Sequence, residues 1–289
     1  MSIAPNEKPV TVSTIMKYKK EGKKITMLTS YDCSTAKYVD EAGVDTILVG
    51  DSVGMVVLGY DTTLKVTMED MKVFTGAVAR GVKRAMVIAD MPFMSYHSSI
   101  EKATENAGEL MRAGAQAVKI EGGTEYIVDL TRHLNNMGIP VCAHLGFTPQ
   151  YLNTIGGYKV QGKSFDCTLR ILEQAKKLEE AGAFMVVFEM VPEESAKYIT
   201  EQLNIPTIGI GAGRYTSGQV LVVDDILGKY GEFKPKFARR YTNLGETIRE
   251  AAKRYIEDVE QGLFPADDEV FKLNDEQRAK LQFLYSKQD

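Results

Sequence analysis

Short runs of apolar residues alternate with amphipathic stretches along most of this chain. Eight of these runs are predicted to be β-strands: Ile25–Thr29, Thr46–Gly50, Met86–Ala89, Ala117–Ile120, Pro140–Ala143, Phe184–Phe188, Pro206–Ile210 and Val220–Val223. The runs are apolar at almost every position, which is typical of strands that are buried on both faces of a parallel sheet.

The stretches between the strands have apolar residues at helical spacing. The predicted helices are Cys33–Ala42, Met68–Gly81, Ser99–Ala113, Glu125–Met137, Phe165–Ala181 and Glu193–Leu203. Thr67 and Ser99 are predicted to be N-caps, because acidic residues follow each of them in the next turn. Glycines stand where helix C-terminal glycines belong, at Gly43, Gly81, Gly114, Gly138 and Gly182.

Eight strands that alternate with helices predict a closed (β/α)8 barrel. An open, doubly wound sheet is the alternative. It is less favoured, because the count is eight and no Gly-x-Gly-x-x-Gly sequence follows the first strand.

Further helices are expected outside the barrel. Thr11–Lys20 is predicted to be helical within an N-terminal segment, 1–24, and a C-terminal tail, 240–289, is predicted to contain helices at Asn243–Gln261 and Asp275–Ser286. Residues 1–289 are expected to form a single domain, because no linker rich in Pro, Gly or Ser separates a second one. The tail could close the barrel or contact another subunit.

Composition excludes several classes of protein. The 289 residues are 44% hydrophobic and 26% charged, as in ordinary globular proteins, and the net charge of -4 without a basic stripe argues against nucleic-acid binding. No apolar segment approaches the ~18 residues of a membrane span, and Met1–Pro9 lacks the apolar core of a signal peptide. The three cysteines show no metal or redox spacing, so we expect reduced thiols and a cytoplasmic protein.

Polar residues stand at the carboxyl end of nearly every predicted strand. They are Asp32, Asp51, Ser52, Asp90, Lys119, Glu121, His144, Glu189, Asp224 and Asp225. In a parallel barrel these ends meet at one mouth, where the active sites of this fold lie. Several carboxylates with one lysine, one histidine and no cysteine cluster predict a hard divalent cation such as Mg²⁺. Asp51 and Asp90 are expected to be direct ligands, and Glu121 a direct or water-mediated one.

Some of these polar residues also have a structural interpretation. Asp32 and Asp224 could simply cap the helices that follow them. Lys119 is expected to face the mouth, because a lysine under a helix would be costly to bury. His97 and His133 are interpreted as surface residues. The Gly209–Gly213 run could bind a phosphate or leave room for a ligand ring.

Seven sequence blocks carry a more specific signal. They are Leu28–Asp32 (LTSYD), Val49–Met55 (VGDSVGM), Ala89–Phe93 (ADMPF), Val118–Gly123 (VKIEGG), His144–Gln150 (HLGFTPQ), Phe188–Pro192 (FEMVP) and Ile208–Gly213 (IGIGAG). In this order they resemble the ketopantoate hydroxymethyltransferase family. The segment Val222–Asp225 departs from the pattern, since the family often has Trp-His-Asp there.

The resemblance implies a TIM barrel of the phosphoenolpyruvate/pyruvate-binding type and one reaction. A one-carbon unit passes from 5,10-methylenetetrahydrofolate to 3-methyl-2-oxobutanoate, giving 2-dehydropantoate in the first step of pantothenate biosynthesis. By position, the implied roles are Mg²⁺ binding for Asp51, Asp90 and Glu121, oxo-acid binding for Asp51, Ser52, Asp90 and Lys119, and proton acceptance for Glu189. The resemblance also implies a homo-oligomer, commonly a decamer. His144 could orient a ligand or a water molecule.

Two other functions are open on the sequence alone. The first is another metal-dependent barrel enzyme acting on 2-oxo acids, of the phosphoenolpyruvate mutase and isocitrate lyase kind, although the Lys-x-Cys-Gly-His motif of those enzymes is absent. The second is a non-catalytic barrel that binds an oxo acid. Such a protein would not need a base such as Glu189 at the end of an apolar strand.

Overall fold

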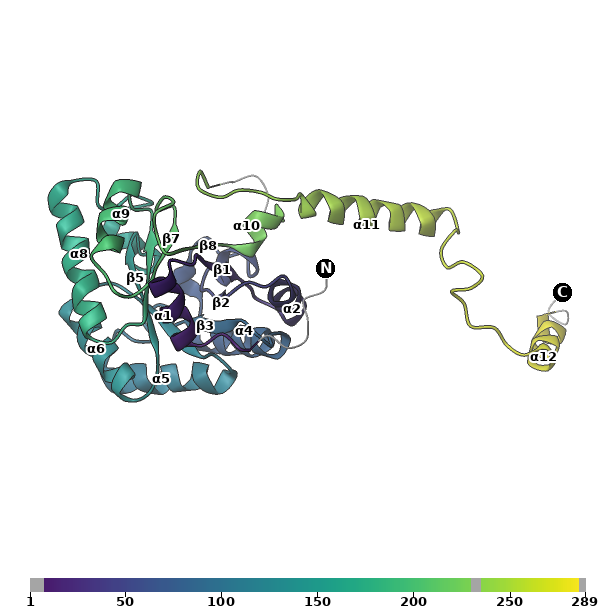
Figure 1. The fold of residues 1–289 in the computed structure, drawn as a ribbon. Coiled ribbons are helices and arrows are strands. Elements are labelled where there is room, and N and C mark those ends of the chain that lie inside the picture. The colour runs from purple at the N-terminus through teal and green to yellow at the C-terminus, as the bar shows by residue number, and fades with distance from the viewer. Residues whose placement is uncertain (1–7, 230–234, 286–289) are drawn as a thin grey trace. The chain divides into compact units, whose positions relative to one another are not determined.

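Eight parallel strands close into a barrel in the computed structural model, which describes residues 8–229 and 235–285 (Figure 1). Each strand pairs with the next, and β8 pairs with β1. The strands are β1 (Ile25–Thr29), β2 (Thr46–Val49), β3 (Met86–Asp90), β4 (Ala117–Glu121), β5 (Val141–Gly146), β6 (Met185–Glu189), β7 (Thr207–Ile210) and β8 (Gly218–Leu221). The predicted closed barrel is therefore confirmed, and the open sheet is excluded.

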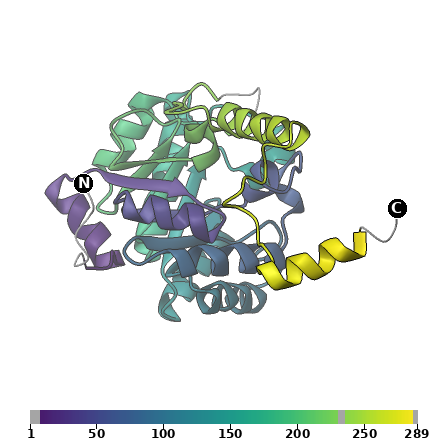
Figure 2. The same ribbon diagram turned by 90° about the vertical axis from the view of Figure 1, so that its right-hand side faces the viewer.

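Helices surround this barrel, as the two views in Figures 1 and 2 show. They are α2 (Cys33–Glu41), α4 (Met68–Gly81), α5 (Ile100–Ala113), α6 (Glu125–Asn136), α8 (Phe165–Glu180), α9 (Glu193–Glu201) and the short α10 (Val223–Leu227). The predicted caps are confirmed. Thr67 accepts a hydrogen bond from the backbone N–H of Asp70, and Ser99 accepts one from that of Lys102.

Successive strand residues point alternately into the barrel and out towards the helices. The outward residues, such as Val118 and Ile120 of β4, belong to a large apolar cluster shared with the helices. The inward residues near the strands' amino ends form a second, smaller cluster that includes Met86, Ala117 and Met185. The lower part of the barrel interior is therefore apolar.

Helix α1 (Val12–Glu21) belongs to the amino-terminal end of this inner core. Val10 and Ile15 are fully buried in the inner cluster, and the Val10 N–H donates to the Arg84 carbonyl just before β3 at 2.8 Å. The segment thus seals the end of the barrel that lies away from the carboxyl ends of the strands.

The two long loops at the carboxyl ends contain short helices. After β2 come α3 (Val53–Val56) and the 3-10 turn η1 (Thr63–Lys65). After β5 come η2 (Pro149–Tyr151) and α7 (Leu152–Ile155). These turns give fixed positions to loop residues that would otherwise carry no regular structure.

The prediction for strand eight was two residues late. The strand begins at Gly218, and Val223 already belongs to α10. The start of the strand was missed because Gly218 and Gln219 are not apolar. Gly218 must nevertheless be glycine, because a Cβ at this position would overlap the carbonyl oxygen of Ile25 in β1. Gly81 has the predicted place at the end of α4, but not the left-handed conformation of a C-terminal glycine. It is the last residue of α4, and its Cβ would overlap the carbonyl oxygen of Cys33, so this glycine allows α4 to approach α2.

The chain divides into two units between Tyr241 and Thr242. The second unit contains α11 (Leu244–Glu260) and α12 (Asp275–Tyr285), and neither helix has a buried residue. The last residue of the second predicted tail helix, Ser286, lies outside the described residues. Across the described ranges, no helix combines the length and apolar character of a membrane span.

Candidate active site

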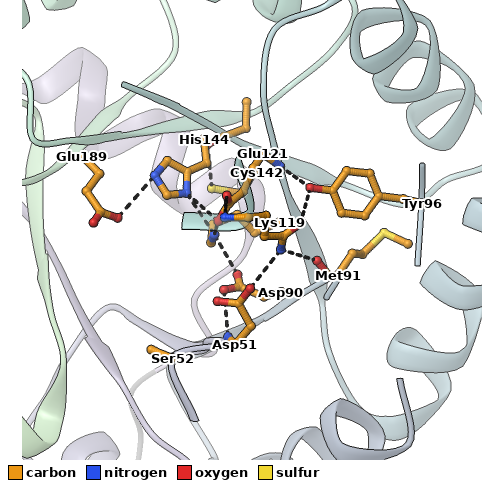
Figure 3. A network of polar contacts seen from close by, with 12 residues as sticks. Asp51, Ser52, Asp90, Met91, Tyr96, Lys119, Glu121, Cys142, His144 and Glu189 are labelled. Carbon is orange, nitrogen blue, oxygen red and sulfur yellow. Dashed lines mark hydrogen bonds and ion pairs between the residues drawn. The ribbon is translucent and has the colours of Figure 1, made fainter. Parts of the chain in front are cut away.

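The inward positions at the carboxyl ends of the strands carry ionisable groups instead of apolar ones. In β3 the inward series ends at Asp90, in β4 it continues as Lys119 and Glu121, and in β6 it ends at Glu189. Cross-strand register places Asp90 beside Lys119 and Glu121 beside His144. The predicted convergence of these residues at one mouth is therefore observed (Figure 3).

Lys119 lies at the centre of this cluster, with Asp51 and Asp90 on one side and His144 on the other (Figure 3). Its Nζ is 3.1 Å from Asp90 Oδ1, 3.6 Å from Glu121 Oε1 and 3.2 Å from His144 Nδ1. Asp51, Asp90, Lys119, Glu121 and His144 are each between 1 and 4% exposed. Lys119 therefore points towards the mouth, as predicted.

His144 lies between Lys119 and Glu189. Its Nδ1 is 3.2 Å from Lys119 Nζ and 3.3 Å from Glu121 Oε1, so this nitrogen accepts from the lysine when unprotonated and donates to the glutamate when protonated. Nε2 is 3.5 Å from Glu189 Oε2, too poorly aligned to count as a hydrogen bond. His144 therefore fills the space between the lysine and the glutamate without a hydrogen bond from Nε2 to Glu189.

The buried charges change one another's protonation. Burial raises the pKa of Asp51 well above its usual value, and the nearby Asp90 and Glu121 carboxylates raise it further. Burial also raises the pKa of Asp90, although Lys119 opposes the effect. Burial alone would lower the pKa of Lys119, but the three carboxylates outweigh it and raise that pKa. Lys119 therefore stays charged, but its single positive charge does not offset the effect of burial on the pKa values of Asp51 and Asp90.

Glu189 has the protonation behaviour of a general base. Burial at the end of an apolar strand raises its pKa to about 8, and the carboxylate of Glu121 adds to the effect. Its side chain keeps 17% exposure, whereas that of Glu121 keeps 1%. Glu189 is thus the more accessible of the two carboxylates and has a pKa near neutrality, where proton abstraction is efficient.

The donor set fits a divalent cation. When Asp51, Asp90 and Glu121 are all ionised, the single ammonium group leaves two negative charges unbalanced in a buried cluster. Asp90 Oδ1 is buried and accepts no hydrogen bond, although it contacts Lys119. Within the described ranges, no three His, Cys, Asp or Glu side chains are arranged to hold a metal by themselves. A Mg²⁺ site needs no such group, since it uses one or two carboxylates together with water and substrate oxygens.

Ser52 lies at the rim beside Asp51. Its Oγ is hydrogen-bonded at 2.8 Å to the hydroxyl of Tyr31, which is buried and has a raised pKa because of that burial. Gly50 allows this arrangement, because a Cβ there would come within 2.8 Å of Ser52 Oγ. The serine hydroxyl is therefore held in place by a residue from the loop after β1.

Two buried residues of the cluster were missed from the sequence. The Gln150 side chain donates at 2.9 Å to Asp51 Oδ2, and its backbone N–H donates at 3.0 Å to Glu121 Oε2. Tyr96 donates at 2.7 Å to Gln150 Oε1. Gln150 stands in one of the seven sequence blocks, but a neutral amide in a loop was not considered as part of a charged site.

Three other strand-end candidates, Asp32, Asp224 and Asp225, lie outside this cluster, and the last two belong to α10. Asp32 caps α2 by accepting from the Thr35 N–H at 2.8 Å. Asp224 is buried in α10 and pairs with Lys229 at 3.1 Å. His97 and His133 were predicted to be surface residues, but both are half-buried. His97 in particular packs against the Tyr96 ring at 4.1 Å, because the loop after β3 folds back over the site.

A cavity of about 290 Å³ lies beside the rim of β4 and β5. Its walls include Gly122 and Gly146, which follow Glu121 and Leu145 directly, and the side chains of Tyr151, Gln161 and Arg170. The Gly209–Gly213 run offers less room, because a Cβ at Gly211 would come within 2.8 Å of the Phe237 ring.

Solved structures of other enzymes have a similar fold. A 2,3-dimethylmalate lyase, described as a PEP mutase/isocitrate lyase superfamily member, matches with a TM-score of 0.58 and 14% identity over 96% of both chains. A phosphonopyruvate hydrolase in complex with oxalate and Mg²⁺ matches with a TM-score of 0.58 and 13% identity, again over 96% of both chains. These likenesses confirm the predicted (β/α)8 barrel fold.

Curated relatives are much closer in sequence, and those named here are all 3-methyl-2-oxobutanoate hydroxymethyltransferases. The protein from Syntrophus aciditrophicus (strain SB) is 55% identical over 94% of this chain and all of its own length. The protein from Clostridium novyi (strain NT) is 50% identical over 94% of this chain and 98% of its own. The family model of ketopantoate hydroxymethyltransferase matches residues 9–267, and the chain therefore belongs to that family.

Proposed function

We propose that this enzyme transfers a hydroxymethyl group to 3-methyl-2-oxobutanoate, with 5,10-methylenetetrahydrofolate as the one-carbon donor. The observation that carries the proposal is the cluster of Asp51, Asp90, Glu121 and Lys119 at the mouth, with Glu189 beyond His144. Family membership and relatives at 50–55% identity support the same reaction, the first step of pantothenate biosynthesis.

Glu189 is the proposed proton acceptor. To act as a nucleophile, C3 of the oxo acid must lose a proton, and a carboxylate with a pKa of about 8 takes a proton more readily than an ordinary glutamate. The carbanion then attacks the one-carbon unit of the donor. The C–N bonds that held this carbon break, tetrahydrofolate leaves, and one water molecule supplies the oxygen of the new hydroxymethyl group. His144 lies beside this carboxylate, with its Nε2 3.5 Å from Glu189 Oε2.

The opposite wall of the mouth is proposed to bind the oxo acid. Asp51 and Asp90 would hold Mg²⁺ directly, and Glu121 directly or through water. When bound, Mg²⁺ would polarise the 2-oxo group and stabilise the enolate charge. Lys119 compensates the negative charge of the substrate, and the Ser52 hydroxyl, oriented by Tyr31, donates to the substrate carboxylate.

The donor is proposed to enter from the β4–β5 side. The cavity of about 290 Å³ beside Gly122 and Gly146 can hold a flat ring system, and Tyr151 offers it an aromatic face. Arg170 at the same cavity suits the carboxylates of a glutamyl tail.

The first test is an assay with both substrates, with and without a metal chelator. Product that forms only when divalent metal is present supports the proposal; no product under any metal condition refutes it. The second test follows the C3 proton of 3-methyl-2-oxobutanoate in deuterated water without the donor. Metal-dependent exchange is expected, and Glu189→Gln should abolish it; undiminished exchange in that variant would remove Glu189 from its role.

We further infer a cytoplasmic homo-oligomer, commonly a decamer in this family. Helix α11 has exposed apolar side chains at Ile248, Tyr255, Ile256 and Val259, and no buried residue, so this face suits a contact between subunits. The three cysteines are free thiols, as in a reducing compartment. Light scattering should give a mass several times 32.0 kDa; a monomer at micromolar concentration would contradict the assembly.

A further inference from the structure

Gln150 contacts two of the three carboxylates proposed as metal ligands, and does so with two different parts of the residue. Its side-chain Nε2 donates to Asp51 Oδ2 at 2.9 Å, and its backbone N–H donates to Glu121 Oε2 at 3.0 Å. The residue is 3% exposed and comes from the turn η2, far along the chain from both partners.

The orientation of the Gln150 amide is fixed by its other contacts. The Tyr96 hydroxyl donates to Oε1 at 2.7 Å, and Nε2 donates a second hydrogen bond to the Met91 carbonyl at 2.9 Å. The Tyr96 oxygen in turn accepts from the backbone N–H of Glu121 at 3.1 Å. Since a carbonyl oxygen cannot donate, a flipped amide would lose its contacts with both Asp51 and Met91.

These hydrogen bonds divide each carboxylate into an occupied and an available oxygen. Asp51 Oδ2 and Glu121 Oε2 are occupied by Gln150, and Asp90 Oδ2 accepts from the backbone N–H of Asp51 at 3.1 Å. The partner oxygens are Asp51 Oδ1, Asp90 Oδ1 and Glu121 Oε1. Of these, Asp90 Oδ1 and Glu121 Oε1 contact Lys119, and Glu121 Oε1 also lies 3.3 Å from His144 Nδ1. Asp90 Oδ1 accepts no hydrogen bond from any described residue.

We propose that Gln150, held by Tyr96, is a positioning residue that presents one oxygen of Asp51 and one of Glu121 to a divalent cation. The inference deepens the metal site of the proposed function and rests on it. Because an amide N–H can only donate, Gln150 also requires Asp51 Oδ2 to act as an acceptor. A neutral residue thus prepares the acidic cluster for a cation without adding charge.

The test is Mg²⁺ binding by calorimetry in the absence of both substrates. Gln150→Leu removes the side-chain bond to Asp51 and should weaken Mg²⁺ binding about tenfold or more. Tyr96→Phe removes one oxygen atom and should weaken binding by a smaller factor, about threefold. The loss in the double variant should be smaller than the product of the two single losses, because Tyr96 acts on Asp51 through the amide, although its hydroxyl also accepts from the Glu121 N–H.

Gln116→Leu is the matched control. Its side-chain Oε1 accepts from the Val87 N–H at 3.0 Å near the amino ends of β3 and β4, so the same substitution removes one hydrogen bond at the far end of the barrel. It should leave the Mg²⁺ affinity within twofold of the unsubstituted protein. An equal loss in Gln150→Leu and Gln116→Leu would mean a general structural effect and would overturn the inference.

The outcomes separate this inference from the proposed function. If the unsubstituted protein binds no Mg²⁺, Mn²⁺ or Co²⁺, the proposed metal site itself fails. If it binds Mg²⁺ and Gln150→Leu binds equally well, only the positioning role fails. Circular dichroism checks folding, and should Gln150→Leu not fold, Tyr96→Phe decides alone: unchanged affinity in that variant refutes the role of the Tyr96–Gln150 pair.

Discussion

At the scale of single residues, the site combines groups that would be unfavourable alone. Glu189 ends an apolar strand, where burial raises its pKa to about 8. That pKa suits proton abstraction, but the same burial means that the folded protein resists ionisation of this side chain. Function and stability therefore place opposite demands on Glu189.

The destabilisation caused by burying the Glu189 carboxylate depends on pH. The folded-state pKa of Glu189 is raised above its unfolded value of 4.5, so the folded state binds more protons between those two pKa values and loses stability as pH rises through them. Glu189→Gln carries no such proton. With chelator present, we expect the variant to become more stable than the parent as pH rises from 5 to 8, by at most ~1.4 kcal/mol per pH unit.

Urea unfolding at four pH values measures this effect. Glu193→Gln is a suitable control, because Glu193 begins α9 only four positions after Glu189, but its pKa is lowered by hydrogen bonds from Arg214. The control should gain nothing over the same pH range. A constant difference between Glu189→Gln and the parent from pH 5 to pH 8 would contradict the raised pKa.

At the scale of elements, strand alternation explains how much the sequence could predict. The strand-end residues Asp90, Glu121 and Glu189 were found because each interrupts an apolar run, and a parallel barrel brings such ends together. The helices were found because their apolar spacing and their caps, such as Thr67, agree with one another. These signals are local, so they survive without any knowledge of the tertiary structure.

Features that arise from tertiary contacts could not be predicted from the sequence. Gln150 joins Asp51 and Glu121 only after β2, β4 and the loop after β5 have met, and nothing in a Thr-Pro-Gln sequence indicates a buried amide. Gly218 looked like a loop residue, because glycine is uncommon in strands. Glycine is needed there because a Cβ would overlap the carbonyl group of Ile25 in β1. In both cases the deciding partner is far away along the chain.

Two helical glycines turn this distinction into a prediction. Gly81 in α4 faces the Cys33 carbonyl of α2, whereas a Cβ at Gly108 in α5 would meet nothing closer than an Arg112 side-chain nitrogen at 3.4 Å. Gly108→Ala should stabilise the protein by about 0.5–1 kcal/mol through helix propensity. Gly81→Ala should destabilise it by about 1–3 kcal/mol, because the helices must move apart. Chemical unfolding measures the free energy of unfolding of both variants. A change of the same sign in both would show that the packing of α4 against α2 does not decide the effect of the substitution.

At the scale of the whole molecule, the barrel gathers on one rim charges that lie up to 138 positions apart, from Asp51 to Glu189. The apolar inner core and α1 fill the opposite end, so the cost of assembling like charges falls entirely on the mouth. A cation that binds there should therefore stabilise the whole fold, in proportion to how far the carboxylates are ionised.

This coupling predicts a thermal shift that depends on pH. The raised pKa values of Asp51, Asp90 and Glu189 mean that the metal-free protein loses stability as pH rises, while ionised carboxylates bind Mg²⁺ more tightly. At a Mg²⁺ concentration about 100 times its dissociation constant, binding adds about 2.7 kcal/mol to the free energy of unfolding. Scanning calorimetry at a fixed Mg²⁺ concentration should therefore give a larger increase in melting temperature over the chelated protein at pH 8 than at pH 6.

Asp51→Asn should reduce this increase at both pH values, whereas Asp129→Asn, whose carboxylate pairs with Arg132 on the surface of α6, should leave it unchanged. Equal increases at pH 6 and pH 8 would mean that the cation binds away from the buried carboxylates.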